Sequence, residues 1–218
     1  FSSPEYFRWL ADCALPCEAE SRLNPSADRQ MQAVLEHLEV PQSRLRILDV
    51  GAGHGDLLEA IIRHGTTDHA IEYIGLSPDP SEHLMRRVLA AKAQRLIGPE
   101  SAITTDLVHA PRSCDRIVLC NVCHTIRLRE LARLLARLLE EHLEQQSGAS
   151  IIILEADLLT AGEARFIMWE PKDYLRIFAS IGGCIVKVTS LMLPGRVPLH
   201  TTIVSRTDQP LPHDLGTI

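Results

Sequence analysis

The chain alternates between two kinds of apolar pattern, and this alternation limits its fold more than any other feature of the sequence. Short apolar runs typical of buried strands are followed by longer segments whose apolar residues recur every three or four positions. Parallel strands joined through helices form a sheet covered on both faces. Strands are predicted at 45–50, 71–76, 101–105, 116–121, 150–155, 184–193 and 199–206, and helices at 56–64, 81–97, 128–145 and 172–181.

The two ends of the chain depart from this alternation. A short turn at Pro194-Gly195 joins the last two predicted strands, so these strands are predicted to be antiparallel. At the other end, Asn24-Pro25 is a helix start signal, with Asn as the cap and Pro in the first turn. We therefore expect a small N-terminal helical cap over residues 1–40, with helices at 4–15 and 24–39, a domain over 41–206 and an irregular tail over 207–218.

Charge and composition narrow the class of protein. The 218 residues suffice for one α/β domain with a small cap, and the net charge of −6 argues against a dominant nucleic-acid surface. No apolar run approaches the roughly 18 residues that span a bilayer, and no signal peptide is visible. Six scattered cysteines indicate reduced thiols, so a cytoplasmic location is expected, with a nuclear one as the alternative. Because the first residue is Phe1 and not Met, we expect other domains of a larger polypeptide as possible partners.

A glycine-rich loop follows the first predicted strand of the domain and opens a helix. Its glycines are spaced Gly51-x-Gly53-x-Gly55, which differs from the G-x-G-x-x-G spacing of dinucleotide-binding loops. Glycines allow a tight turn and a close approach of a ligand to the backbone, and the helix behind the loop offers unpaired N–H groups. The loop therefore predicts a nucleotide-like ligand at the carboxyl end of the strand. A glycine turn in another kind of α/β domain is the alternative.

With an acid at Asp49, this loop resembles motif I of the class I S-adenosylmethionine-dependent methyltransferases. The order of elements over residues 24–206 and the terminal hairpin resemble that family as well. The resemblance implies an α/β, Rossmann-like, seven-stranded and mostly parallel sheet, with helices on both faces and a terminal antiparallel hairpin. It also implies S-adenosylmethionine as the cofactor.

The same resemblance implies roles for individual residues. Asp49 would approach the amino-acid end of the cofactor, and the loop residues would let it pass close to the backbone. The family has an acid after the second strand for the ribose, whereas here Ser77 stands at that position and Asp79 substitutes only if the loop bends back. Asp106 would accept a hydrogen bond from the adenine amino group; the alternative is that Asp106 is a solvated residue in a turn. The full set of expected cofactor-binding residues is Asp49, Gly51, Ala52, Gly53, Gly55, Leu76, Ser77, Asp79, Asp106, Leu107, Asn121 and Val122.

Residues 115–124 resemble motif IV of the family, at the carboxyl end of a strand. Asn121 would line the methionine part of the cofactor, and His124 is a candidate general base because histidine titrates near neutral pH. A purely structural role for His124 stays open. Glu155 ends the next strand and is a second candidate catalytic residue, for an acceptor amine or a cation, or else a solvated carboxylate. Trp169 is expected in the core or in an apolar lid.

Two functions follow from this resemblance. The first is an S-adenosylmethionine-dependent methyltransferase with an unidentified acceptor, a small molecule being favoured over a protein or RNA. The Pro-Pro motif of enzymes that methylate amino groups in nucleic acids is absent after Asn121. The second is a module that binds the cofactor without turnover, which the serine at Ser77 favours. The Cys120-x-x-Cys123 spacing is interpreted as buried thiols, so no metal is expected, and neither a membrane nor a nucleic acid is expected as a partner.

Overall fold

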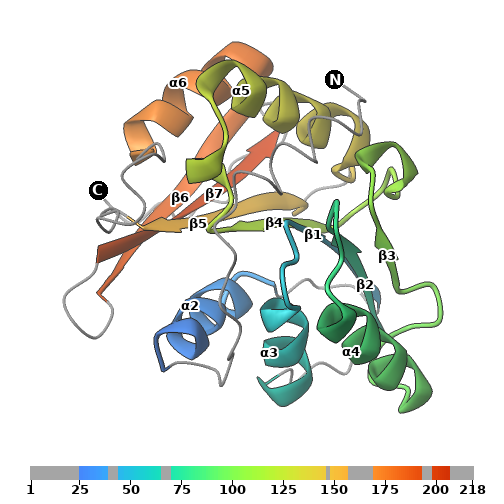
Figure 1. Ribbon diagram of the computed structural model, residues 1–218. Helices are drawn as coiled ribbons and strands as arrows, with labels where there is room; N and C mark the ends of the chain where they lie inside the picture. The colour runs from blue at the N-terminus through green and yellow to red at the C-terminus, as the bar shows by residue number, and fades with distance from the viewer. Residues whose placement is uncertain are drawn as a thin grey trace.

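Seven strands form a single sheet in the order β3-β2-β1-β4-β5-β7-β6 (Figure 1). The computed structural model describes residues 25–38, 44–64, 70–145, 148–156, 169–192 and 198–206. The strands are β1 (Arg44–Val50), β2 (Ala70–Leu76), β3 (Ala102–Thr104), β4 (Arg116–Cys120), β5 (Ser150–Ala156), β6 (Gly183–Met192) and β7 (Pro198–Arg206). The helices are α2 (Pro25–Leu35), α3 (Asp56–His64), α4 (Glu82–Ala93), α5 (Leu128–Arg137) and α6 (Pro171–Ile181).

The first five strands are parallel, as the alternating pattern predicts. Leu48 of β1 lies opposite both Ile74 of β2 and Ile117 of β4. Central strands of a parallel sheet are buried on both faces, which explains their nearly continuous apolar sequences. In β4, for example, Ile117, Val118 and Leu119 are all fully buried.

The last two strands complete the sheet, and β7 runs in the opposite direction to its neighbours. β7 lies between β5 and β6 and is antiparallel to both. The predicted terminal hairpin is therefore confirmed. Leu154 and Thr201 pair across β5 and β7, and Glu155 pairs with His200 at the end of β5.

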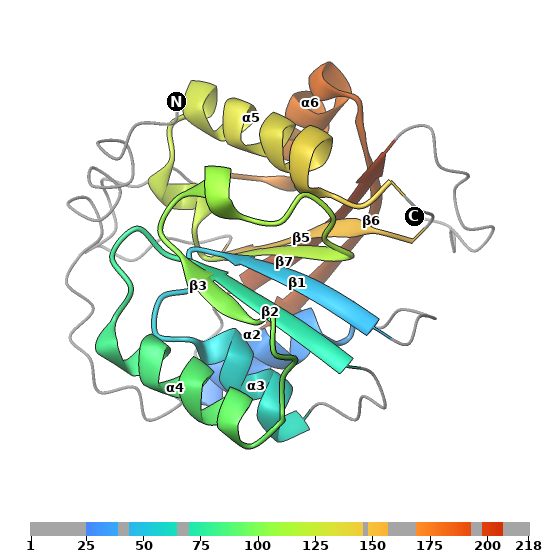
Figure 2. The ribbon, with the colours of Figure 1, turned by 90° about the vertical axis from the view of Figure 1, so that its right-hand side faces the viewer.

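Helices cover both faces of the sheet, α2, α3 and α4 on one and α5 and α6 on the other (Figure 2). Successive residues of a strand point to opposite faces, so one strand supplies both cores. Ile151 and Ile153 pack with the α5 and α6 side, whereas Ile152 and Leu154 pack with the α2, α3 and α4 side. This two-faced burial confirms the predicted fold class.

Two helices of the predicted domain 41–206 end differently from their predicted bounds. The helix predicted to reach residue 97 ends at Ala93, because Arg95 adopts a left-handed conformation with φ of 58°. The helix predicted to reach residue 145 changes at Leu138 into a short π-helix, η3 (Leu138–His142). The wider turn brings Leu143 beside Cys114 as an isolated bridge, which local apolar spacing does not encode.

The helix predicted at 24–39 is present as α2 but ends at Leu35, and residues 36–38 form a turn. Met31 and Val34 of α2, and Leu38 in the turn after it, are buried in the core. The predicted helix at 4–15 and the predicted irregular tail at 207–218 lie outside the described residues. Within the described ranges, no helix is both long and apolar enough to cross a membrane.

Candidate ligand site at the carboxyl edge of the sheet

The loops that follow β1, β2, β3 and β4 meet at one edge of the sheet, together with the carboxyl end of β5, because parallel strands carry their carboxyl ends on the same side. This edge holds the glycine loop 51–55, the segment 77–81, the turn at 105–106 and the loop 121–127. Glu155 adds a carboxylate near the end of β5. The candidate residues of the sequence analysis therefore gather on one edge, although they come from five different strands.

The glycine loop packs closely against Val122 at Gly51 and is open at Gly53. Gly51, Gly53 and Gly55 have φ values of 76°, 51° and 84°, in the left-handed region that favours glycine. A Cβ at Gly51 would lie 2.5 Å from Val122 Cγ2, whereas the nearest neighbour of a Cβ at Gly53 is the Gly51 carbonyl oxygen at 3.8 Å. The loop therefore presents its open surface at Gly53.

Asp49 lies beneath this loop as a buried carboxylate. Its Oδ2 accepts a hydrogen bond from the Tyr73 hydroxyl at 2.6 Å, and both side chains are buried. Burial raises the pKa of Asp49 to about 7; the Tyr73 hydrogen bond opposes the rise and the charge of Asp56 adds to it. Sequence reasoning missed Tyr73, whose place in an apolar strand indicates only a core residue.

The segment after β2 supports the glycine loop. Ser77 is buried and its N–H donates to the Thr104 carbonyl at 2.9 Å, while Asp79 is exposed. Ser81 caps α4 by accepting from the Leu84 N–H at 3.1 Å, and its hydroxyl lies 3.4 Å from the Gly53 carbonyl oxygen. One serine thus joins the start of α4 to the loop.

Replacement of Ser81 by alanine is expected to lower the free energy of unfolding by about 1 kcal/mol, the usual cost of losing an N-cap. Urea unfolding followed by circular dichroism measures this change. Ser180→Ala is the matched control, because Ser180 is exposed and bonds only the Ile177 carbonyl of its own helix. Equal stabilities of the two variants would contradict the capping role.

The turn after β3 is built around Asp106. Its Oδ1 accepts from the Val108 N–H at 3.0 Å, which caps the short helix η1 (Leu107–His109). The Leu107 side chain is buried in the core. The structure therefore gives Asp106 a local structural role, beside the adenine-binding role that the resemblance implies.

Asn121 lies directly after β4 with a left-handed φ of 54°. A residue other than glycine whose backbone is held in this conformation is often found at functional sites. Its Nδ2 donates to Gln30 Oε1 of α2 at 2.6 Å. The neighbouring Val122 packs on Gly51, so the loop after β4 lies against the glycine loop. Gln30 is 91 positions from Asn121, and no local pattern links the two.

His124 and Glu155 form a buried pair. His124 Nδ1 lies 2.8 Å from Glu155 Oε2, and Glu155 Oε1 accepts from the Cys123 N–H at 2.5 Å. The side chains of His124 and Glu155 are 12% and 1% exposed. A carboxylate bound at Nδ1 favours the tautomer with its proton there, which leaves Nε2 as an acceptor. Glu155 therefore contacts protein through both oxygens.

Aromatic and thiol groups enclose this pair. The Trp169 indole donates to the Cys123 carbonyl at 2.8 Å and is buried, so Trp169 belongs to the core. Burial raises the pKa of the Cys120 and Cys123 thiols well above the ordinary value. Within the described ranges, no group of three or more potential ligands is placed to hold a metal ion.

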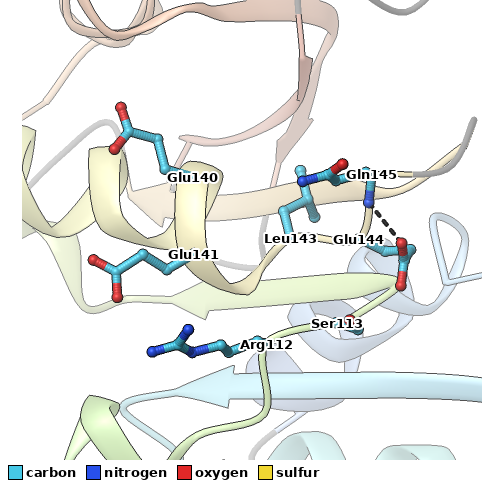
Figure 3. A pocket seen from close by; sticks show the side chains of 7 residues that line it. All are labelled: Arg112, Ser113, Glu140, Glu141, Leu143, Glu144 and Gln145. Carbon is cyan, nitrogen blue, oxygen red and sulfur yellow. Dashed lines mark hydrogen bonds between the residues drawn. The ribbon is translucent and has the colours of Figure 1, made fainter.

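A separate hollow of about 460 Å³ lies at the amino ends of the strands, next to the segments that precede β4 and β5 (Figure 3). Figure 3 shows Arg112 and Glu141 side by side within it. Glu141 also pairs with Arg137, whose hydrogen bond lowers the pKa of that carboxyl. The hollow is lined by Arg112, Ser113, Glu140, Glu141, Leu143, Glu144 and Gln145, none of which belongs to the candidate site.

Solved structures share this fold, whereas no protein-family model and no curated protein matches the sequence. Magnesium protoporphyrin IX methyltransferase ChlM from Synechocystis PCC 6803, solved with bound SAM, is 15% identical with a TM-score of 0.62 over 94% of this chain and 93% of that one. The cyclase SpnF is 15% identical with a TM-score of 0.62, over 89% and 86%.

The mitomycin 7-O-methyltransferase MmcR is 12% identical with a TM-score of 0.60, over 84% of this chain. This chain spans about half of MmcR, 54% of its length. At these identities the similarity describes the fold. The chain has the class I, Rossmann-like methyltransferase fold, as the glycine loop and the order of elements predict.

Proposed function

We propose that the chain binds S-adenosylmethionine at the carboxyl edge of the sheet and transfers its methyl group to a small molecule. The observation that carries this proposal is the open glycine loop at Gly53, with the His124–Glu155 pair on the same edge of the sheet. The ChlM structure, which holds SAM in the same fold, supports the choice of cofactor.

The residues present suit most parts of this cofactor. Asp49 lies two positions before the first glycine of the loop and would face a ligand ammonium, and Asn121 would lie beside the methionine part. Asp106 would hold the adenine. At the ribose position, the buried Ser77 and the exposed Asp79 replace the acid that the resemblance leads one to expect. We therefore expect the ribose to contribute less to binding than the two ends of the ligand.

When bound, the cofactor supplies an electrophilic methyl group, and the protein supplies position and a proton acceptor. His124 Nε2 would take the proton of an acceptor hydroxyl, while Glu155 holds the ring through Nδ1. Orientation of the acceptor is the other contribution, because methyl transfer depends strongly on the alignment of the reacting groups.

A small molecule suits this site better than a nucleic acid. The net charge of −6 provides no general attraction for phosphates. The solved structures with this fold include methyltransferases named for mitomycin and magnesium protoporphyrin IX, which are small molecules. These observations support a small molecule as the class of acceptor.

A Glu155→Gln variant is expected to lower the rate of methyl transfer about 100-fold, within the range for losing general-base catalysis. The amide nitrogen can donate to His124 Nδ1, which would move the ring proton to Nε2. The rate is measured with tritiated S-adenosylmethionine and the first acceptor found, while the affinity for S-adenosylhomocysteine is expected to stay the same. Glu141→Gln, in the separate hollow, is the control. An unchanged rate in Glu155→Gln would contradict the role of the pair.

A module that binds the cofactor without turnover is the second candidate. Ser77 at the ribose position favours it, as does the cyclase SpnF, whose name describes a different reaction on the same fold. Binding without transfer to a broad set of hydroxyl-bearing small molecules would favour this candidate.

Calorimetry tests the proposed cofactor site. We expect micromolar binding of S-adenosylmethionine and S-adenosylhomocysteine, and no binding of NAD⁺. Gly53→Ala should weaken the binding of S-adenosylmethionine and S-adenosylhomocysteine, because the new methyl group points into the open side of the loop. Arg112→Ala, in the separate hollow, should leave the binding of both ligands unchanged. Absence of binding at millimolar ligand would overturn the proposal.

A further inference from the structure

The helix α2 reaches the candidate site through one side chain. Gln30 Oε1 accepts a hydrogen bond from Asn121 Nδ2 at 2.6 Å. The carboxyl end of α2 is also fixed. In the turn after the helix, the His37 carbonyl accepts a hydrogen bond from Arg116 Nε at 2.8 Å. Arg116 begins β4 and Asn121 follows it, so the two contacts hold α2 at both ends of one strand.

The placement of Gln30 does not depend on this hydrogen bond alone. The next residue, Met31, is buried in the core, as is Val34 one turn further on. The packing fixes the rotation of α2 about its axis, and with it the direction in which Gln30 leaves the helix. Gln30 therefore meets Asn121 from a fixed position.

The carboxamide of Asn121 has both of its hydrogens directed to neighbours. Nδ2 donates one hydrogen to Gln30 Oε1. The other is directed to Cys120 Sγ, which lies 3.8 Å from Nδ2. An amide nitrogen has two hydrogens to donate, so Oδ1 is the group of this side chain that is left for a ligand. Asn121 is exposed, and its backbone is fixed by the bond from its N–H to the Leu154 carbonyl at 2.8 Å. Asn121 can thus act toward a ligand as an acceptor.

We propose that Gln30 is a positioning residue that orients Asn121, so that Asn121 Oδ1 accepts a hydrogen bond from the ammonium group at the amino-acid end of the ligand. This inference rests on the proposed function. Val122 places the loop after β4 against Gly51, so Asn121 stands beside the loop that the cofactor would cross. Recognition of the amino-acid end then depends on α2, whereas recognition of the adenosine end does not.

Two ligands separate these ends. S-adenosylhomocysteine has the amino-acid end, and 5′-methylthioadenosine has the adenosine without it. Gln30→Leu removes the acceptor for Asn121 Nδ2 and is expected to weaken S-adenosylhomocysteine binding about five- to ten-fold, the usual scale for one hydrogen bond between uncharged groups. Binding of 5′-methylthioadenosine should not change. Gln30→Glu keeps an acceptor at the same place and is expected to restore the affinity.

Gln32→Leu is the matched control, because Gln32 is exposed on the same helix. Thermal unfolding of each variant shows whether α2 stays folded. Equal weakening of both ligands by Gln30→Leu would overturn the inference, since that result indicates a general structural role, and so would unchanged binding of S-adenosylhomocysteine. If the unmodified chain binds neither ligand, the proposed function fails, and the inference fails with it.

Discussion

Replacement of Asp49 by asparagine is expected to stabilise the fold at pH 8 and to weaken cofactor binding. Burial raises the pKa of Asp49 from 3.8 to about 7. The folded state therefore binds this proton more tightly than the unfolded state, and stability falls as the pH rises from about 4 to about 7. Above pH 7 the loss is complete, on the order of 4 kcal/mol. Asparagine carries no such charge and can still accept from the Tyr73 hydroxyl.

Urea unfolding at pH 4 and pH 8 measures this effect. The Asp49→Asn variant should exceed the unmodified chain in free energy of unfolding by a few kcal/mol at pH 8, and by little at pH 4. Asp79→Asn is the control, because Asp79 is exposed. In calorimetry, the affinity of Asp49→Asn for S-adenosylmethionine should fall at least ten-fold, because the carboxylate that would face the ligand ammonium is lost. A variant that is less stable than the unmodified chain at pH 8 would contradict this account of Asp49.

Replacement of Gly51 by alanine is expected to lower the free energy of unfolding by roughly 2–5 kcal/mol. A left-handed conformation costs a residue with a Cβ about 1–2 kcal/mol, and overpacking adds about 1–3 kcal/mol. The overpacking arises because the new Cβ would lie 2.5 Å from Val122 Cγ2. Cofactor binding should be lost as well, since relief of the clash separates the two loops that form the site.

The Gly148→Ala variant separates the conformational cost of Gly51→Ala from its overpacking cost. Gly148 also has a positive φ, of 96°, but nothing lies within 4 Å of a Cβ placed there. Gly148→Ala should therefore show the conformational cost alone, about 1–2 kcal/mol. In the double variant Gly51→Ala with Val122→Ala, the clash is relieved and part of the stability should return. Equal losses in Gly51→Ala and Gly148→Ala would show that Val122 does not constrain the loop.

Much of the fold could be predicted from the sequence because its elements have local patterns. The strands of the parallel sheet read as apolar runs, and the Pro194-Gly195 turn identified the antiparallel pair. Helix ends were harder to predict. The left-handed Arg95 that ends α4 and the π-helix at Leu138 depend on how the chain returns to the sheet, which local spacing does not encode.

The residues of the candidate site were also only partly predictable from the sequence. The glycine loop and the two strand ends that carry Asn121 and Glu155 could be recognised from sequence. The partners of these residues could not, because each comes from a distant element. Tyr73 bonds Asp49 from the neighbouring strand, and Gln30 bonds Asn121 from α2. Such pairs form only when the sheet is assembled, and the sequence carries no periodic signal for them.

Hydrogen exchange of the backbone amides, measured with and without S-adenosylhomocysteine, tests the location of the ligand site most directly. The ligand is expected to slow exchange at residues 51–55, 105–108 and 121–124, the loops that meet at the carboxyl edge of the sheet. Exchange at 112–113 and 140–145, around the separate hollow, should stay the same. Slower exchange confined to that hollow, or no change anywhere at saturating ligand, would contradict a ligand site at the carboxyl edge of the sheet.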